Sequence, residues 1–172
     1  AIGWLMVKSG LVPEKCFVGH IELTTHLMAA LLLLSYTLWF ALKLKVPERQ
    51  LITQAPLQKF LLVITAVLFL QLIYGGFMAG IKAAVVAPTW PTINGYWIPT
   101  SMGEMSPVIK NILYNPISIH FIHRGLAYLL FILVIIWWYQ SKGIKNSTMF
   151  SSLRSLLLVL LTSQVLLGIL TV

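Results

Sequence analysis

The sequence is short of charged residues, and above all of acidic ones. Its 172 residues contain no aspartate and four glutamates, and only 9% of them are charged. A soluble domain carries about 25% charged residues, so this composition excludes an ordinary soluble domain. Proton relays and divalent-metal sites use carboxylates, which this chain can barely supply.

Several chemical motifs are also missing. The one cysteine, Cys16, has no second thiol in the chain and cannot form an internal disulfide, although a cysteine elsewhere in a longer protein could pair with it. There is no Cys-x-x-Cys-His sequence, which excludes covalent attachment of a c-type haem. No glycine-rich phosphate-binding loop and no nucleophile motif occurs, so nucleotide chemistry and covalent hydrolysis have no support.

What the sequence has in abundance is long apolar segments. Hydrophobic residues make up 59% of the chain, and its mean hydropathy is +0.91. Four segments are close to the ~20 residues that a helix needs to cross a bilayer. These segments are Ile21–Leu42, Leu57–Gly80, Ile117–Tyr139 and Ser152–Val172.

The two ends of the chain are apolar as well. The opening AIGWLMVKSG is typical of the last turns of a further helix, and the final LLGILTV still belongs to an apolar run. We therefore predict an all-α polytopic transmembrane helix bundle with four full spans and the end of a fifth. We expect this chain to be an internal piece of a larger protein.

Basic residues alternate between the connections. The connection 43–59 carries four basic residues and one glutamate, and 140–154 carries three basic residues and no acid. The connections 8–20 and 81–116 each carry two lysines and one glutamate. The positive-inside rule places the first two in the cytoplasm (or in the matrix of a mitochondrion) and the other two on the outer side. The net charge of +8 thus orients the chain in a lipid bilayer, and we predict no nucleic-acid partner.

Histidines stand near the outer ends of two predicted spans. HFIHRGLAYLLF places His120, His123 and Arg124 at the start of one span, and ELTTHLMAA places His26 near the start of another. Ionisable groups at membrane depth are costly, which makes them functional candidates. Both spans run from the outer to the inner side, so His26 and His123 lie at similar depth. They are candidate ligands of haem iron or another metal on a common shelf. The alternative for each is an interhelical hydrogen bond.

The polar neighbours of these histidines have open assignments. His120 lies within ~60° of His123 on the helix surface. It is a partner of His123, a second ligand or a rim residue, and we favour the rim. His20 lies ~120° away from the face of His26, which favours a loop or interface role. Arg124 either neutralises a haem propionate at the outer surface or extends to lipid phosphate.

The outer connection 81–116 is rich in proline, tryptophan and tyrosine. Such a segment can close the bundle from the aqueous side. Between a simple seal and direct contact with a substrate, we favour the seal.

Two short patterns occur twice. QLIYGGFMAG and QVLLGILTV share Gln-x-x-x-Gly near the outer ends of their spans, and GWLMVKSG continues in the same way as GGFMAGIK. After GWLMVKSG and after GGFMAGIK comes an outer connection, and each of these connections is followed by a span that carries a histidine. This predicts a repeated helix pair, in which small residues allow close approach of a helix or a ring. If the repeat holds, a helix after Val172 and one before Ala1 should each bring another histidine.

The chain resembles haem A synthase, the membrane enzyme of cytochrome oxidase assembly. The resemblance covers most of the chain, in segments that occur in the family's order: GWLMVKSGL, ELTTHLMAALLL, GGFMAGIKAAVVAPTWPTINGYWIP, NPISIHFIHRGLAYLL and TSQVLLGILTV. GWLMVKSGL and the Phe-x-His-Arg-Gly pattern are the specific parts, whereas the apolar spans between them are not.

The resemblance implies an eight-helix protein of two similar halves, with histidines on the even-numbered helices. Residues 1–45 would end the first half with the tail of helix three and helix four. Residues 46–56 would form a cytoplasmic linker, and 57–172 would begin the second half with helices five to seven. His26 and His123 would then ligate different haems, each with a partner outside this chain, which replaces the common shelf.

The implied sites differ in what they hold. The first would bind the substrate haem and the second a permanent haem b. The family's catalytic acid lies three residues before the histidine of helix two, outside this chain. The corresponding place before His123 is His120, so no catalytic residue can be named here and the chain alone should be inactive.

The implied activity is oxidation of a ring methyl group of haem O to the formyl group of haem A. The implied partners are haem O and haem A, the lipid bilayer, the haem O-forming farnesyltransferase and cytochrome oxidase assembly factors. The implied location is the bacterial plasma membrane, or the mitochondrial inner membrane in a eukaryote. An alternative is a transmembrane b-type cytochrome that only transfers electrons through the same histidines. A third possibility is an assembly or transport protein whose histidines bind no haem.

Overall fold

The computed structural model describes residues 2–10, 17–144 and 147–171, and within them the protein is helical without a β-strand. The α-helices are α1 (Ile2–Lys8), α2 (His20–Lys45), α3 (Ala55–Ile81), α4 (Ala83–Val86), α5 (Ile109–Tyr114), α6 (Pro116–Gln140) and α7 (Thr148–Leu170). Short 3-10 turns occupy Glu48–Gln50, Thr100–Gly103 and Ser141–Gly143. Cys16 lies outside the described residues.

Within the described residues, four helices are long and apolar enough to cross a membrane, namely α2, α3, α6 with its 3-10 extension, and α7. This confirms the four predicted spans and the helical start of the chain. The boundaries differ by a few residues because polar caps decide where helices begin. α7 begins at Thr148 rather than Ser152, because the Ser147 hydroxyl accepts a hydrogen bond from Phe150 N at 3.1 Å. α3 begins at Ala55 rather than Leu57, with a proline in its first turn.

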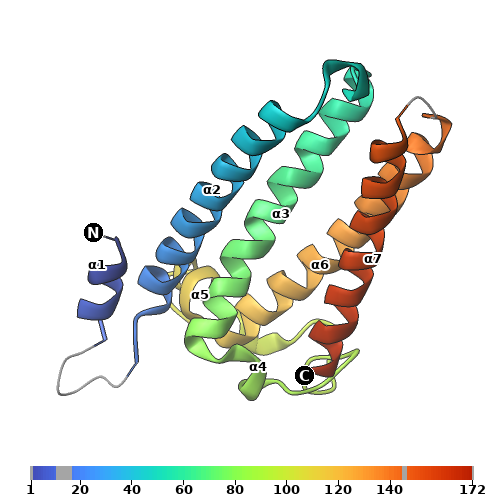
Figure 1. Ribbon diagram of the computed structural model, residues 1–172. Helices are drawn as coiled ribbons and strands as arrows, with labels where there is room; N and C mark the ends of the chain where they lie inside the picture. Colours follow the sequence, from blue (N-terminus) through green and yellow to red (C-terminus); the bar gives the residue numbers. More distant parts are fainter. Residues whose placement is uncertain (1, 11–16, 145–146, 172) are drawn as a thin grey trace.

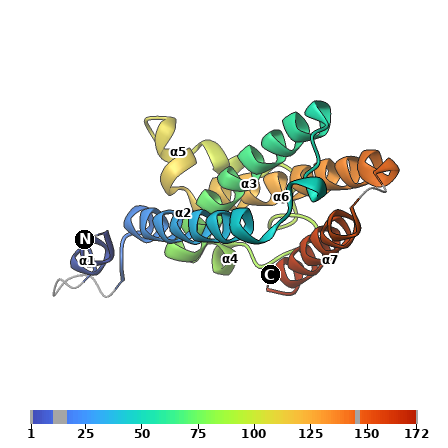
Figure 2. The same cartoon turned by 45° about the horizontal axis from the view of Figure 1, so that its top comes forward.

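The long helices form an antiparallel bundle (Figure 1). α3 packs against both α2 and α6, α7 packs against α6, and α1 lies beside the start of α2. Figures 1 and 2 both show α1 on the far side of α2 from α7. The connections α2–α3 and α6–α7 lie at one end of the bundle (Figure 1), which agrees with the alternation of basic connections in the sequence.

The larger buried apolar cluster among the described residues lies at the end of the bundle that carries the basic connections, and a smaller one joins the outer segment to the start of α6. The larger cluster joins α3, α6 and the segment that follows α6, and α7 adds partly buried side chains to it. The buried members are Leu57, Ile64, Leu130, Val134, Trp137 and Ile144. The indole nitrogen of Trp137 donates to the Leu57 carbonyl at 3.3 Å, so the one polar atom of this large side chain has a partner. α7 has no fully buried residue, and most of its apolar surface faces outward as expected of a helix in lipid.

The outer segment between α3 and α6 is folded onto the start of α6. Asn115 caps α6 by accepting from Ile117 N and Ser118 N, and its amide donates to the Ser101 carbonyl at 2.8 Å. The Ser118 hydroxyl donates to the Met102 carbonyl at 2.9 Å. Sequence reasoning treated this segment as one connection, whereas it contains α4, a 3-10 turn and α5.

Glycines bring α2 and α3 together near the outer end. A Cβ atom added at Gly76 would lie 2.5 Å from Thr24 Oγ1, and one at Gly80 would lie 2.6 Å from the Cα of His20. These distances are below any normal contact, so only glycine permits the observed approach of the two helices.

The variant Gly80→Ala should therefore separate the helices. We expect the free energy of unfolding in mixed micelles to fall by about 1–3 kcal/mol, as for an overpacked core. Gly125→Ala is the matched control, because a Cβ at Gly125 of α6 meets nothing within 4 Å. That control should be neutral or slightly stabilising, and equal loss in both variants would contradict the packing account.

Candidate functional site

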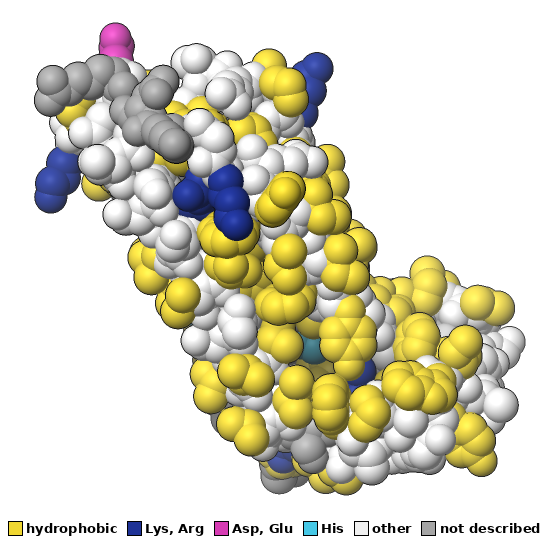
Figure 3. All heavy atoms as spheres, turned by 90° about the vertical axis from the view of Figure 1, so that its right-hand side faces the viewer, with side chains coloured by type: hydrophobic (Ala, Val, Ile, Leu, Met, Phe, Trp, Pro, Cys, Tyr) yellow, Lys and Arg dark blue, Asp and Glu magenta, His cyan; other side chains and the backbone are white. Residues whose placement is uncertain are grey.

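A cavity of about 610 Å³ lies between α3, α6 and α7 near the outer end of the bundle. Its walls are mainly apolar, with a few polar side chains from α3, α6 and α7. Figure 3 shows a hollow on a face of hydrophobic side chains, with a histidine at its floor and a basic side chain beside it. The volume and the mixture of apolar walls and few polar groups are typical of a site for an organic ligand.

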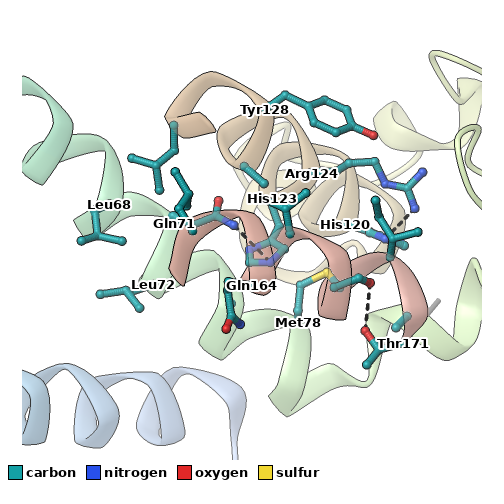
Figure 4. Close-up of a pocket in the computed structure, with 18 of the residues that line it drawn as sticks. Leu68, Gln71, Leu72, Met78, His120, His123, Arg124, Tyr128, Gln164 and Thr171 are labelled. Carbon is teal, nitrogen blue, oxygen red and sulfur yellow. Dashed lines mark hydrogen bonds between the residues drawn. The ribbon is translucent and has the colours of Figure 1, made fainter. Parts of the chain in front are cut away.

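His123 lies on α6 and lines this cavity. Its Nε2 atom is 3.3 Å from the amide nitrogen of Gln71 on α3 (Figure 4). The other ring nitrogen, Nδ1, is buried without a hydrogen-bond partner, and so is Oε1 of Gln71. Buried polar atoms without partners are uncommon in folded proteins, so these atoms mark a place where a ligand can complete the contacts.

Arg124 joins the outer segment to α6. Its Nη1 donates to the carbonyls of Pro91 and Thr92, both at 3.1 Å. Its Nη2 donates to the Thr89 carbonyl at 2.9 Å and to His120 Nε2 at 3.0 Å. The guanidinium thus bonds to the protein beside His120 (Figure 4), and Arg124 is among the residues that line the cavity.

His120 is not a rim residue, contrary to the expectation from the sequence. Its side chain is only 2% exposed, and it lines the cavity beside Arg124. Because Arg124 donates to Nε2, the neutral ring carries its proton on Nδ1, which is buried without a partner. His120 Nδ1 is therefore a further unpaired polar atom near the cavity, besides His123 Nδ1 and Gln71 Oε1.

The outer segment does more than seal the bundle. Trp90 lines the cavity, and its indole nitrogen donates to the hydroxyl of Tyr128 on α6 at 3.2 Å. The segment therefore contributes a wall of the site as well as a cover, whereas sequence reasoning favoured the cover alone.

His26 lies elsewhere. Its ring is half-buried against Gly3 of α1, and it is not among the residues that line the cavity. α1 and α7 lie on different sides of α2 (Figure 2), so the structure does not bring His26 and His123 together. Both histidines nevertheless lie near the start of their helices, and α2 and α6 begin at the same end of the bundle. This agrees with the similar depth predicted from the sequence.

His20 is an interface residue, as predicted. Its Nε2 is 2.8 Å from the Leu113 carbonyl, and its ring packs edge-on against Phe77 and Tyr114. It lies at the junction of α2, α3 and α5 and does not line the cavity.

Two glutamines of the site had no role assigned from the sequence. Gln71 and Gly75 of α3 line the cavity, and so do Gln164 and Gly168 of α7. The repeated Gln-x-x-x-Gly pattern in the sequence could have indicated these glutamines. Only the glycines of that pattern were interpreted from the sequence, as residues that allow close approach of a helix or a ring. Residues four apart share one face of a helix, which is why both members of each pair face the same cavity.

Comparison with known proteins decides the family. A family described as cytochrome oxidase assembly protein, COX15-CtaA, matches residues 1–172. The chain belongs to this family. The four membrane-spanning helices agree with that membership, and together with bacterial relatives they indicate an integral protein of the bacterial plasma membrane.

Curated relatives in the COX15-CtaA family carry the name "Heme A synthase". The protein of Flavobacterium johnsoniae is 36% identical over 172 residues, which are 99% of this chain and 50% of that protein. The protein of Nitrosospira multiformis is also 36% identical, over 99% of this chain and 48% of its own length. The chain spans about half the length of the curated relatives it matches. No solved structure matches the chain.

Proposed function

We propose that the whole protein is a haem A synthase, which oxidises a methyl group of haem O to the formyl group of haem A for cytochrome oxidase assembly. The observation that carries the proposal is the imidazole of His123 in a large apolar cavity, with a buried ring nitrogen that has no partner. The proposal is supported by the name "Heme A synthase", which relatives that match 99% of this chain carry.

The residues of the cavity fit a haem. Neutral imidazole is the common protein ligand of haem iron, and His123 supplies one inside an apolar wall. Among the described residues no three His, Cys, Asp or Glu side chains gather into a site for a bare metal ion. We propose that His123 ligates a resident haem b, and that His26 ligates the substrate haem O at a separate site.

Arg124 supports this site in two ways. Its positive charge stands at the cavity, where negatively charged propionates of a haem would be favoured. Its three hydrogen bonds to carbonyls of the outer segment also fix that segment over the site. A haem of this type supplies the redox chemistry, and the protein ligates the iron, orients the ring and excludes water.

The chain then divides between two halves of the whole protein. Residues 1–45 would end the first half, 46–56 would form the cytoplasmic linker, and 57–172 would open the second half. Gln164 and Gly168 repeat on α7 the pair that contacts His123 from α3. We infer that a histidine from a helix that follows Val172 faces this second pair. The haem O-forming farnesyltransferase and oxidase assembly factors are the expected protein partners.

The activity is tested by co-expression of the full-length protein with the haem O-forming farnesyltransferase. We expect haem A to appear in extracted membrane pigments, measured by chromatography and by the spectrum of the pyridine complex. The control is the farnesyltransferase alone, which should yield haem O. A full-length protein that binds haem b but leaves haem O unchanged would be a simple electron carrier. A colourless protein in the presence of excess haem would contradict both functions.

A further inference from the structure

We propose that Gly75 and Gly3 are positioning residues, which set the orientation of the His123 and His26 rings by leaving room for one edge of each imidazole. The inference rests on the proposed function, in which these rings ligate haem iron. It assigns a role to two glycines that lie inside helices and form no turn.

The two glycines meet the two histidines in the same way. A Cβ added at Gly75 would lie 3.3 Å from Cε1 and 3.8 Å from Nδ1 of His123. A Cβ added at Gly3 would lie 3.3 Å from Cε1 and 3.7 Å from Nδ1 of His26. In both pairs the same edge of the histidine ring faces a glycine. Gly3 lies on α1, before the helix of His26, and Gly75 lies on α3, before the helix of His123.

The correspondence comes from separate parts of the fold. One pair joins α1 to α2, and the other joins α3 to α6. Gly3 and Gly75 also hold equivalent places in the repeated patterns GWLM and GGFM. Both copies of the repeated pattern place glycine against the same imidazole edge, which indicates a shared requirement of the two rings, since either contact alone would be ordinary packing.

Other glycines of the long helices do not show this contact. Added Cβ atoms at Gly76 and Gly80 would meet Thr24 and the Cα and Cβ of His20, which are packing contacts between α2 and α3. Added Cβ atoms at Gly125 and Gly168 meet nothing within 4 Å. Contact with the face or edge of a candidate ligand ring is therefore specific to Gly3 and Gly75.

α3 holds the His123 ring at two points. Gln71, one turn before Gly75, approaches Nε2, while Gly75 lies against Cε1. A methyl group at Gly75 would displace Cε1 by a few tenths of an ångström, because 3.3 Å is tighter than ordinary contact. The ring would rotate about its side-chain bonds and change the direction of its nitrogen toward the iron. Mutation of a group that orients a metal-ligating histidine typically lowers metal affinity about 10–100-fold.

The test compares Gly75→Ala and Gly3→Ala with Gly125→Ala in the full-length protein purified with haem. In Gly75→Ala we expect the electron paramagnetic resonance signal of the His123-ligated haem to shift and its haem affinity to fall about 10–100-fold. Gly3→Ala should shift the signal of haem O bound at the His26 site and leave the other signal unchanged. Gly125→Ala should match the wild type in both signals.

The outcomes separate this inference from the function on which it rests. If His123→Ala retains its haem, the ligand assignment fails and the glycine inference fails with it. If His123→Ala loses haem while both Gly75→Ala and Gly3→Ala keep wild-type signals and affinities, only the positioning role is wrong. Should Gly75→Ala not assemble, Gly3→Ala decides the question, because Gly3 lies on the short α1 outside the contact between α3 and α6.

Discussion

Replacement of His123 with alanine in the full-length protein is expected to remove nearly all of the haem bound at this site. His123 is the proposed iron ligand of the cavity, and the surrounding walls are mainly apolar. Without ligation by His123, a haem at this site would be held mainly by contacts with the apolar walls. The loss is measured as the ratio of the haem absorption band to protein absorbance in the purified variant.

Two controls sharpen this expectation. Added imidazole can enter the space left by the side chain, and it should restore part of the absorption band if the only defect is the missing ligand. His20→Ala is the matched histidine control, because His20 packs at the junction of α2, α3 and α5 and does not line the cavity. It should lower stability but keep the haem. An unchanged haem band in His123→Ala would overturn the ligand assignment.

Arg124→Ala should release the outer segment from the bundle. The guanidinium makes four hydrogen bonds, to three carbonyls of the segment and to His120. Hydrogen bonds to a charged group contribute roughly 1.5–3 kcal/mol each, although water at the membrane surface can replace part of them. We expect a loss of about 3 kcal/mol in unfolding free energy, together with rapid proteolysis between residues 83 and 108.

Arg124→Lys separates geometry from charge. A lysine keeps the positive charge at the cavity but cannot donate to three carbonyls in the fixed geometry of a guanidinium. Arg124→Lys should therefore remain sensitive to proteolysis, and it should retain more haem than Arg124→Ala if the charge attracts propionates. A proteolysis pattern in Arg124→Ala identical to that of the wild type would show that the segment is held in another way.

The cover formed by the outer segment bears on how the site works. Hydrogen bonds of Arg124, and the one from Trp90 to Tyr128, connect this segment to α6 at the cavity, so the segment is held against the site by bonded contacts. The remaining hollow lies on a face of hydrophobic side chains (Figure 3). A macrocycle in such a site would lie against mainly apolar walls, where a neutral imidazole is a suitable ligand.

The membrane spans were predictable because the hydropathy of each segment controls them. A helix that crosses hydrocarbon must satisfy its backbone internally and present apolar side chains over about 20 residues, and both demands are visible in the sequence. The same holds for the direction of the helices, since charge alternates between successive connections. Helix ends were less predictable, because capping side chains such as Ser147 extend a helix past the apolar stretch.

The site was only partly predictable. Helical periodicity shows which residues share a face with His123, but it cannot show what that face meets. The contact between His123 and Gln71 joins residues 52 positions apart. The hydrogen bonds of Arg124 to the outer segment reach 32 to 35 positions back along the chain. The first interpretation of His26 and His123 as a common shelf used depth alone. Depth follows from position along a span, whereas the partner of a side chain depends on rotation and neighbours.

By itself, then, the sequence determined a membrane bundle, the direction of its helices, the depth of its histidines along them and the repeat that relates them. Tertiary structure alone decided that His26 turns toward α1 and His123 toward a cavity between α3, α6 and α7. It also decided that Arg124 bonds to backbone carbonyls and that His120 is buried. The physical reason is that hydropathy is a property of each segment, whereas a binding site is formed by side chains from several segments whose packing sets their distances.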